Sequence, residues 1–311
     1  MKQAKSPHNH WAPQYWPTWI GLGCLRVICL LPHTAALAVG RVFGRIAHRV
    51  GAQRRAIVRR NIQLCFPELS TAERNTLAHE HFLALGMSAI EMGLGRWASD
   101  RAIQDLCDIE NLEYLTEPMA AGKGVIILSA HFTTLEVSGL AVRLAGVPYD
   151  AVFRRNRSEF ITELLRKGRE RSAESTIEKR DIKKMVRRLR HGAAVWYAPD
   201  QSYKRKGAEV VPFFGVPTMH TTATATLARL GRAVVVPFFP LRTPEGRYVL
   251  KFLPAFEDFP TDDAIEDVMR YMRVLEEQIR ECPEQYFWVH RKFKDLPEGY
   301  EDYYADLDAL K

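Results

Sequence analysis

Short apolar runs alternate with amphipathic helical patterns over most of the chain. The runs are rich in β-branched and aromatic side chains, which is typical of buried strands. They occupy residues 125–130, 149–153, 193–198, 233–238 and 248–253. Helical patterns fall between or after them, at residues 158–171, 181–191, 218–230 and 262–281. This alternation predicts an α/β fold, in which helices flank a mixed sheet with a substantial parallel part.

A long helix is predicted before the first strand. Ser70 and Glu73 form a capping-box pattern, in which each side chain accepts a hydrogen bond from the other residue's backbone N–H. The helical pattern that they open continues to about Trp97. We found no internal repeat and no low-complexity linker, so we expect one domain after the amino-terminal segment.

That amino-terminal segment is typical of a membrane anchor. Residues 20–31 contain Arg26 as their only charge and follow Trp16 and Trp19, and tryptophan favours membrane interfaces. The stretch is short for a full span, and Pro32 interrupts it. A tilted or interfacial anchor and a true crossing both fit, and an ordinary buried first helix is the alternative.

The basic excess of the chain lies entirely beside this segment. The 311 residues carry a formal net charge of +7, but residues 1–67 hold ten basic residues and no Asp or Glu. The rest of the chain therefore carries about −3 by the same count. Such a distribution favours anionic lipid on the cytoplasmic side over a nucleic-acid partner. We expect residues 1–45 to form the anchor and its basic segment, and residues 46–311 to form the main domain.

Several common kinds of site are disfavoured. The five cysteines are scattered and include no Cys-x-x-Cys pair, which argues against disulfides and a cysteine zinc site and for a reducing compartment. The chain has no Walker loop, no dinucleotide-binding glycine loop, no Gly-x-Ser-x-Gly and no His-Glu-x-x-His. We therefore expect no metal and no cofactor.

His131 and Glu136 follow directly after the strand predicted at residues 125–130. Residues five apart on a regular helix do not face each other, so a plain helix cannot pair these two. If His131 ends the strand and Glu136 lies in the first turn of the next helix, the carboxylate can fold back onto the imidazole. The pair would then be a general base and its orienting acid. The alternative is a core histidine beside an unrelated glutamate at a helix start.

Other charged residues follow the remaining predicted strands. Arg154 and Arg155 follow the second, Asp200 the third and Arg242 the fourth. Carboxyl ends of parallel strands meet at one edge of a sheet, so a base, cations and a carboxylate would converge in a cleft there. Taken singly, Arg154 is also compatible with a surface charge, and Asp200 with a turn residue after a proline.

These residues belong to a set of motifs that occur in the same order in a known protein family. The motifs are residues 15–19, 59–68, 131–136, 195–201 and 283–291. With them the chain resembles the late acyltransferases of lipid A biosynthesis, the lauroyl-type enzymes that acylate Kdo-lipid IVA. The likeness extends from about residue 15 to residue 304. The His-x4-Glu element alone would also fit glycerol-phosphate and related acyltransferases.

The resemblance implies an acyltransferase domain with the mixed sheet of glycerol-phosphate-acyltransferase-like folds. It implies an enzyme of the bacterial inner membrane, active on its cytoplasmic side. The donor would be an acyl-acyl carrier protein, and the acceptor a membrane lipid that presents a hydroxyacyl chain. His131 would be the general base with Glu136 as its partner, and no covalent acyl-enzyme would be required.

The resemblance also implies substrate-binding residues. Arg154, Arg169 and Arg171 match basic positions of the family and are assigned to the acceptor's phosphate or Kdo carboxylates, which favour a bidentate guanidinium. Asp200 matches the family's Pro-Asp element and is expected to organise the site. Residues 202–207 are more basic than in many relatives, and Lys292 stands where a second arginine is expected. These departures concern the substrate rather than the reaction.

Two other functions fit parts of the sequence. One is another membrane-bound O-acyltransferase of the same His-x4-Asp/Glu type, acting on glycerol-phosphate or a glycolipid. The other is a non-catalytic protein that binds membranes or nucleic acid through its basic amino terminus. The second predicts that replacing His131 or Glu136 by alanine leaves activity intact, and it gives no reason for a base and an acid at a strand end.

Overall fold

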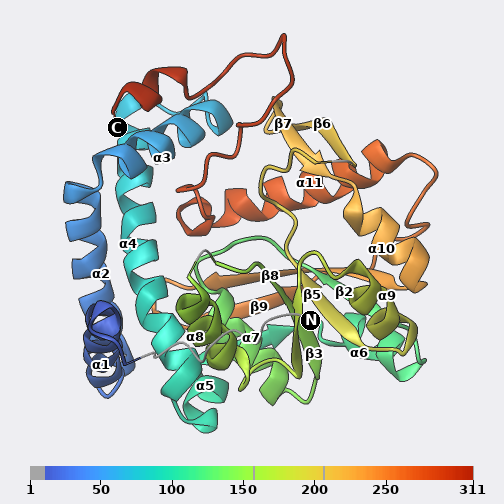
Figure 1. Ribbon diagram of the computed structural model, residues 1–311, viewed down its shortest axis with the longest axis horizontal. Helices are drawn as coiled ribbons and strands as arrows, with labels where there is room; N and C mark the ends of the chain where they lie inside the picture. The colour runs from blue at the N-terminus through green and yellow to red at the C-terminus, as the bar shows by residue number, and fades with distance from the viewer. Residues whose placement is uncertain (1–10, 157, 206, 311) are drawn as a thin grey trace.

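A seven-stranded sheet lies at the centre of the computed structural model, which describes residues 11–156, 158–205 and 207–310. Helices pack on both of its faces (Figure 1). The strands of this sheet are β1 (Cys107–Glu110), β2 (Val125–Leu128), β3 (Tyr149–Phe153), β4 (Ser175–Glu178), β5 (Ala194–Tyr197), β8 (Val234–Arg242) and β9 (Tyr248–Phe252). The predicted α/β class, with a mostly parallel sheet, is confirmed.

The strand order places β2 in the middle of the sheet. The order is β1-β9-β8-β2-β5-β3-β4, and β8 and β9 are the antiparallel pair, while the other neighbours are parallel. The strands β8, β2, β5, β3 and β4 therefore all point the same way. Their carboxyl ends share one edge of the sheet, which is where α/β proteins bind ligands.

The α-helices cover both faces of the sheet, and the amino-terminal helices form a layer beside it (Figure 1). They are α1 (Trp16–Ile28), α2 (His33–Val50), α3 (Ala52–Cys65), α4 (Thr71–Trp97), α5 (Asp100–Leu106), α6 (Glu113–Ala120), α7 (Leu135–Leu144), α8 (Glu159–Arg169), α9 (Ile182–Arg190), α10 (Ala223–Gly231) and α11 (Ala264–Glu281). Short 3-10 helices cover Pro13–Tyr15, Pro283–Gln285 and Ala305–Leu310. In Figure 1 the long α4 runs beside α2, and α11 crosses above the sheet.

The apolar run that begins β2 is buried on both faces. Ile126 and Leu128 belong to the core on one side of the sheet, and Val125 and Ile127 to the core on the other. All four side chains are fully buried. Because successive strand residues point to opposite faces, a continuous apolar run is needed for a strand that is covered twice. The strand is thereby fixed rigidly before the loop that carries His131.

Most predicted elements are confirmed to within a few residues. The strand β3 has the predicted bounds, and α4 begins after Ser70 with the full capping box, since each of Ser70 and Glu73 accepts from the other's backbone N–H. The helix predicted at residues 218–230 is wrong at its start. Its first residues form β7 (Val216–Thr221), which pairs antiparallel with β6 (Ala208–Phe213). The turn residues Phe214 and Gly215 both have positive φ, as tight hairpin turns require.

Three glycines let α2 and α4 approach each other closely. A Cβ atom at Gly86 of α4 would lie 2.1 Å from the carbonyl oxygen of Gly40, and one at Gly44 would lie 2.3 Å from that of Phe82. Real side chains do not make such contacts with backbone. The spacing of Gly40 and Gly44 places both on one helix face, so the helices contact backbone to backbone.

Replacing Gly86 by alanine is therefore expected to destabilise the protein. The added methyl group meets backbone that cannot move alone, and overpacking of this kind costs about 1–3 kcal/mol. We expect a fall of several degrees in the thermal unfolding midpoint of the detergent-solubilised protein. Gly21→Ala on α1, where nothing lies within 4 Å of the added atom, is the matched control. Equal midpoints for the two variants would contradict the close packing.

The amino-terminal segment forms the helices α1 and α2. Among the residues that the structure describes, no helix has both the length and the apolar character that a membrane crossing requires. The apolar stretch predicted as an anchor is helical as α1, which ends before Pro32.

Candidate active site

His131 and Asp200 occupy equivalent places beyond two neighbouring strands. Leu128 of β2 pairs in register with Tyr197 of β5, and each site residue lies three positions further on. Imidazole Nδ1 of His131 lies 2.6 Å from carboxylate Oδ1 of Asp200. The parallel register thus brings together two residues that are 69 positions apart in the chain.

The surroundings of Asp200 keep it ionised. Its side chain is 2% exposed, and the Tyr286 hydroxyl donates to its second oxygen at 3.1 Å. Burial alone would raise the pKa of Asp200, but the charge and hydrogen bond of His131 and the charge of Lys292 outweigh it and hold that pKa well below its ordinary value. A carboxylate only accepts, so His131 Nδ1 carries the proton. In the neutral form of the ring, Nε2 is then the nitrogen that can accept a proton.

Lys292 holds the backbone of Asp200 in place through a hydrogen bond. The ammonium group donates to the backbone carbonyl of Asp200 and lies over the ring of Phe213. It is almost fully buried, and burial lowers the pKa of Lys292 to about 8, against the opposing attraction of Asp200. Lys292 is therefore mostly protonated at neutral pH and fixes the turn that presents the carboxylate.

A second histidine, His290, lies nearby, and no carboxylate among the described residues hydrogen bonds to its ring. The ring centres of His290 and His131 are 6.5 Å apart. Burial, together with the charge of His131, lowers the pKa of His290 to about 4, so this ring is neutral at neutral pH. Of the two, only His131 has a hydrogen-bonded carboxylate that would stabilise a proton taken from a substrate.

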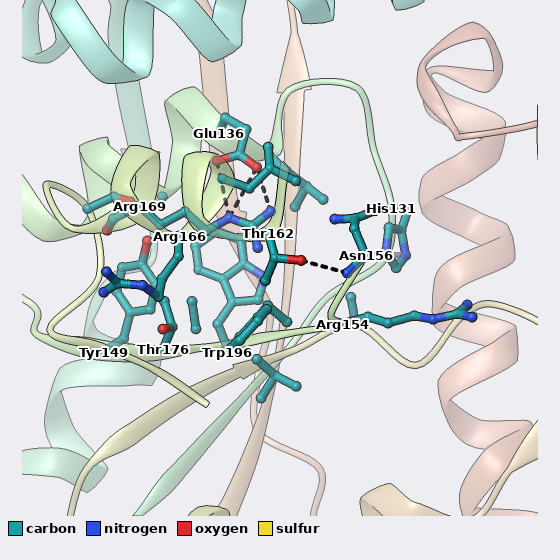
Figure 2. A pocket seen from close by; sticks show the side chains of 18 residues that line it. His131, Glu136, Tyr149, Arg154, Asn156, Thr162, Arg166, Arg169, Thr176 and Trp196 are labelled. Carbon is teal, nitrogen blue, oxygen red and sulfur yellow. Dashed lines mark hydrogen bonds and ion pairs between the residues drawn. The ribbon is translucent and has the colours of Figure 1, made fainter. Parts of the chain in front are cut away.

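Glu136 is held by an arginine. It lies in the first turn of α7, as predicted, but its carboxylate accepts from Nη2 of Arg169 at 2.6 Å and from Nε at 3.2 Å. Figure 2 shows this pair on one side of the pocket and His131 on the other. The expected pairing of Glu136 with His131 is therefore not formed, and Asp200 accepts the hydrogen bond of the His131 imidazole instead. The cause is that α8 presents Arg169 to Glu136, while the register of β5 presents Asp200 to His131.

The predicted arginines have different surroundings. Arg154 lies directly after β3 and lines the site. Arg169 also lines it, with its guanidinium engaged by Glu136. Arg171 pairs with Asp100 of α5 and lines neither of the two cavities described below, so the prediction that it contacts substrate gains no support. Arg242 is buried in an ion pair with Glu91 of α4 and likewise lies outside both cavities, so it does not join the predicted cleft.

Two cavities meet at His131 and Arg154. The first, of about 240 Å³, is mostly apolar and is lined among others by Leu135, Gly139, Phe153, Leu165 and Trp196. The second, of about 90 Å³, is polar and basic and is lined among others by Asn61, Asp200, His290, Arg291 and Lys294. In Figure 2 the first cavity extends from His131 and Arg154 toward Tyr149 and Thr176. The His131 imidazole therefore lies between the apolar cavity and the basic cavity.

Two residues of the site were not predicted as such. Tyr286 and Lys292 both contact Asp200, and both come from the carboxy-terminal segment that returns to the sheet edge. Phe132 and Tyr286 form an isolated antiparallel bridge that fastens this segment beside the His131 loop. The motif at residues 283–291 was the available signal, but its pattern does not reveal which strand end it approaches.

Comparison with known proteins places the chain in a family. The family model described as bacterial lipid A biosynthesis acyltransferase matches residues 3–295. The chain belongs to this family of lipid A biosynthesis acyltransferases.

Relatives of this acyltransferase in the family carry names for different acyl chains. It is 38% identical to the lipid A biosynthesis lauroyltransferase of Escherichia coli over 92% of the chain and 94% of the relative. Identity to the palmitoleoyltransferase of the same organism is 34% over 96% of the chain and 97% of the relative. Identity to the lipid A biosynthesis myristoyltransferase of Escherichia coli is 27% over 92% of the chain and 90% of the relative. The lipid A acyltransferase resemblance predicted from the motifs is confirmed.

Proposed function

We propose that this lipid A acyltransferase transfers a lauroyl-type chain from acyl-acyl carrier protein to a hydroxyl group on a hydroxyacyl chain of Kdo-lipid IVA. The observation that carries the proposal is the His131–Asp200 pair at the junction of an apolar and a basic cavity. Such a junction suits a reaction between an acyl group and an anionic lipid. The 38% identity to a lauroyltransferase favours a chain of that type.

The apolar cavity is suited to the acyl chain. Its walls include Leu135, Phe153, Leu165 and Trp196, and burial of each methylene group contributes about 0.8 kcal/mol. His131 lies at one end, so a chain that fills the cavity leaves its thioester carbon beside the imidazole. The far end, at Tyr149 and Thr176, would then limit the chain length that is accepted.

The His131 imidazole acts as a general base in this reaction. Nε2 takes the proton from the acceptor hydroxyl, and the oxygen attacks the thioester carbonyl carbon. The carbon–sulfur bond then breaks, and the imidazolium returns the proton to the departing thiolate of the carrier. Asp200 accepts the Nδ1 hydrogen bond throughout, which fixes the tautomer and stabilises the imidazolium. Charges balance without a covalent acyl-enzyme.

Glu136 acts through Arg169 in this account. The pair joins α7 to α8 across the apolar cavity, and both side chains are about one-third exposed, at 28% and 30%. Their charge-assisted hydrogen bonds fix the cavity wall near His131. Loss of Glu136 would leave Arg169 uncompensated beside the acyl chain. Glu136 is thus expected to be needed for activity as a positioning residue.

The proposed function is tested by measuring which acceptor receives the acyl chain. Purified protein in detergent is incubated with radiolabelled lauroyl-acyl carrier protein and either Kdo-lipid IVA or glycerol-3-phosphate, and the products are separated by thin-layer chromatography. We expect label on Kdo-lipid IVA only. Label on glycerol-3-phosphate alone would reject the lipid A acceptor and leave a different O-acyltransferase. No product from the Kdo-lipid with folded protein would also reject it.

We also propose that the protein works at the cytoplasmic face of the bacterial inner membrane, held there by α1 and the outer face of α2. Most exposed large apolar side chains among the described residues lie within residues 11–50. Val42, Phe43 and Ile46 of α2 are about half exposed, and the arginines of the basic segment alternate with them. Apolar side chains among arginines are typical of helices that lie in an anionic membrane interface.

Replacing Phe43 by glutamate is accordingly expected to weaken membrane binding. Phe43 is 45% exposed, so inserting its exposed part contributes about half of the 1.5–3 kcal/mol expected for a whole side chain, or about three- to tenfold in partitioning. Flotation with vesicles that contain anionic lipid measures the bound fraction. Ile265→Glu on α11, where the side chain is 42% exposed, is the control and should float like the wild type. Equal flotation of both variants would contradict an α2 contact.

A further inference from the structure

Lys179 and Arg154 lie side by side at the carboxyl ends of β4 and β3. These strands are parallel, and Phe153 pairs with Glu178 in register, so each cation is the first residue beyond that pair. The backbone N–H of Lys179 donates to the carbonyl oxygen of Phe153 at 2.7 Å, which fixes the alignment. The next strand toward the centre is β5, which Asp200 follows. The two cations therefore continue the row of site residues along the sheet edge.

Neither cation has an acidic partner. In the part of the chain that the structure describes, no carboxylate forms an ion pair or hydrogen bond with the side chain of Lys179 or Arg154. The ammonium of Lys179 lies over the ring of Tyr203, 5.4 Å from its centre. Burial lowers the pKa of Lys179, and repulsion from Arg154 and Arg205 lowers it further. Lys179, Arg154 and Arg205 thus lie close together, and no carboxylate is paired with Lys179 or Arg154 among the described residues.

The attraction of Asp200 does not relieve this excess of positive charge. Asp200 attracts Lys179, but both of its oxygens already accept hydrogen bonds, from His131 and Tyr286. A half-buried ammonium without a partner is unfavourable in the free protein. Ion pairs neutralise Arg169 and Arg171, the other two arginines that were assigned to substrate. Lys179 and Arg154 lack such a partner, and both lie on the same side of His131, beyond Asp200 in the row.

We propose that Lys179 and Arg154 form a subsite for a substrate phosphate group, with Lys179 as its buried cation. A guanidinium binds phosphate with two parallel hydrogen bonds, and an ammonium binds it as a compact point charge. Arg154 lines both cavities and Lys179 lines neither, so a phosphate held between them lies beside the site. The inference rests on the proposed function for the identity of the ligand and on the cation geometry for the site itself.

Two substrate phosphates have the required chemistry. One is a phosphate on the sugar of the lipid acceptor, and the other is the phosphodiester of the pantetheine arm that carries the donor thioester. Calorimetric titration of the full-length protein in detergent distinguishes them. The ligands are Kdo-lipid IVA with its phosphatase-treated form, and holo-acyl carrier protein with the apo form that lacks the arm.

Lys179→Met is expected to weaken binding of one phosphate-bearing ligand about 10- to 100-fold, the usual effect of losing a charged hydrogen bond. Its phosphate-free counterpart should change by no more than about twofold. Lys179→Arg should retain most of the affinity. Lys123→Met, an exposed lysine before β2 at the opposite edge of the sheet, should bind like the wild type. A selective loss with the lipid identifies the acceptor phosphate, and one with the carrier identifies the donor phosphodiester.

The result that overturns the subsite is equal binding of all ligands by Lys179→Met and wild type, or equal weakening of phosphate-bearing and phosphate-free forms. A structural role for Lys179 predicts a lower thermal midpoint in Lys179→Met, whereas an unpaired ligand-binding cation predicts an unchanged or higher one. The calorimetric titrations measure ligand binding and do not require acyl transfer. Phosphate-dependent lipid binding without acyl transfer would therefore reject the proposed function and keep the subsite.

Discussion

Replacing His131 by alanine is expected to lower kcat/KM for acyl transfer by about 10²- to 10⁴-fold, the usual contribution of a general base. The variant loses the group that removes the hydroxyl proton, while both cavities remain. Substrate binding should change much less than the rate. Initial rates with saturating acyl-acyl carrier protein, combined with calorimetric affinity for the lipid acceptor, separate the two effects.

His290→Ala is the informative comparison for His131→Ala. Both imidazoles line the basic cavity, but of the two rings it is that of His131 which hydrogen bonds to Asp200. We expect His290→Ala to keep most of the activity. A large loss in His290→Ala together with an active His131→Ala would transfer the role of base to the other ring and contradict the account.

Asp200→Asn is expected to reduce the rate by a similar factor, about 10²- to 10⁴-fold. The amide is neutral, so it cannot stabilise the imidazolium. It can also donate to Nδ1, which would place the imidazole proton on Nε2, where the substrate must be met. The downfield proton resonance of the Nδ1–H group, observed by NMR, reports on this contact.

Glu136→Gln is the matched control for that resonance. If Asp200 is the partner of His131, the signal disappears in Asp200→Asn and persists in Glu136→Gln, whatever the activity of the second variant. The reverse pattern would restore the pairing of His131 with Glu136 that the spacing in the sequence predicts. Activity alone would not separate the two, because both carboxylates support the site.

The Asp200 carboxylate also contributes to stability in a definite pH range. Its pKa in the folded protein lies below the ordinary value of 3.8, so ionisation favours the folded state. The contribution is complete above about pH 4 and is lost as the pH falls through the folded-state pKa. The difference in thermal midpoint between wild type and Asp200→Asn should therefore be constant near neutral pH and shrink only in strong acid.

The sequence predicts the edge of the sheet where the site lies, because apolar runs mark the buried strands. The runs before His131 and Asp200 are continuous and apolar, the run before Arg154 is interrupted only by Asp150, and all three became parallel strands. A residue that directly follows such a run is placed at the strand end within a position or two. That is enough to gather candidates, since parallel strands share the edge.

The partners of these residues are not predictable in the same way. A spacing of five residues indicates that Glu136 can approach His131. Asp200 is the residue that pairs with His131, however, and the register of β2 and β5 places it there. Likewise, Arg169 and Arg171 look available in the sequence until Glu136 and Asp100 neutralise them. Such contacts depend on which strands and helices become neighbours, and local patterns carry no information on that order.

Lys179 was missed for a related reason. It follows β4, a four-residue edge strand with the sequence Ser-Thr-Ile-Glu, in which only Ile177 is buried. A short strand covered on one face lacks the apolar run that marks β2 or β5. The hairpin of β6 and β7 was misjudged because threonine and alanine at residues 221–225 fit both a strand and a helix start.

Mass spectrometry of the acceptor tests the central claim most directly. Kdo-lipid IVA is incubated with the detergent-solubilised protein and a mixture of acyl carrier proteins loaded with chains of different length, beside His131→Ala. The account predicts that the wild type adds one acyl group of a single mass, in the range of a lauroyl chain, and that the variant adds none at matched times. An unchanged acceptor mass with folded wild-type protein, or equal acylation by His131→Ala, would contradict it.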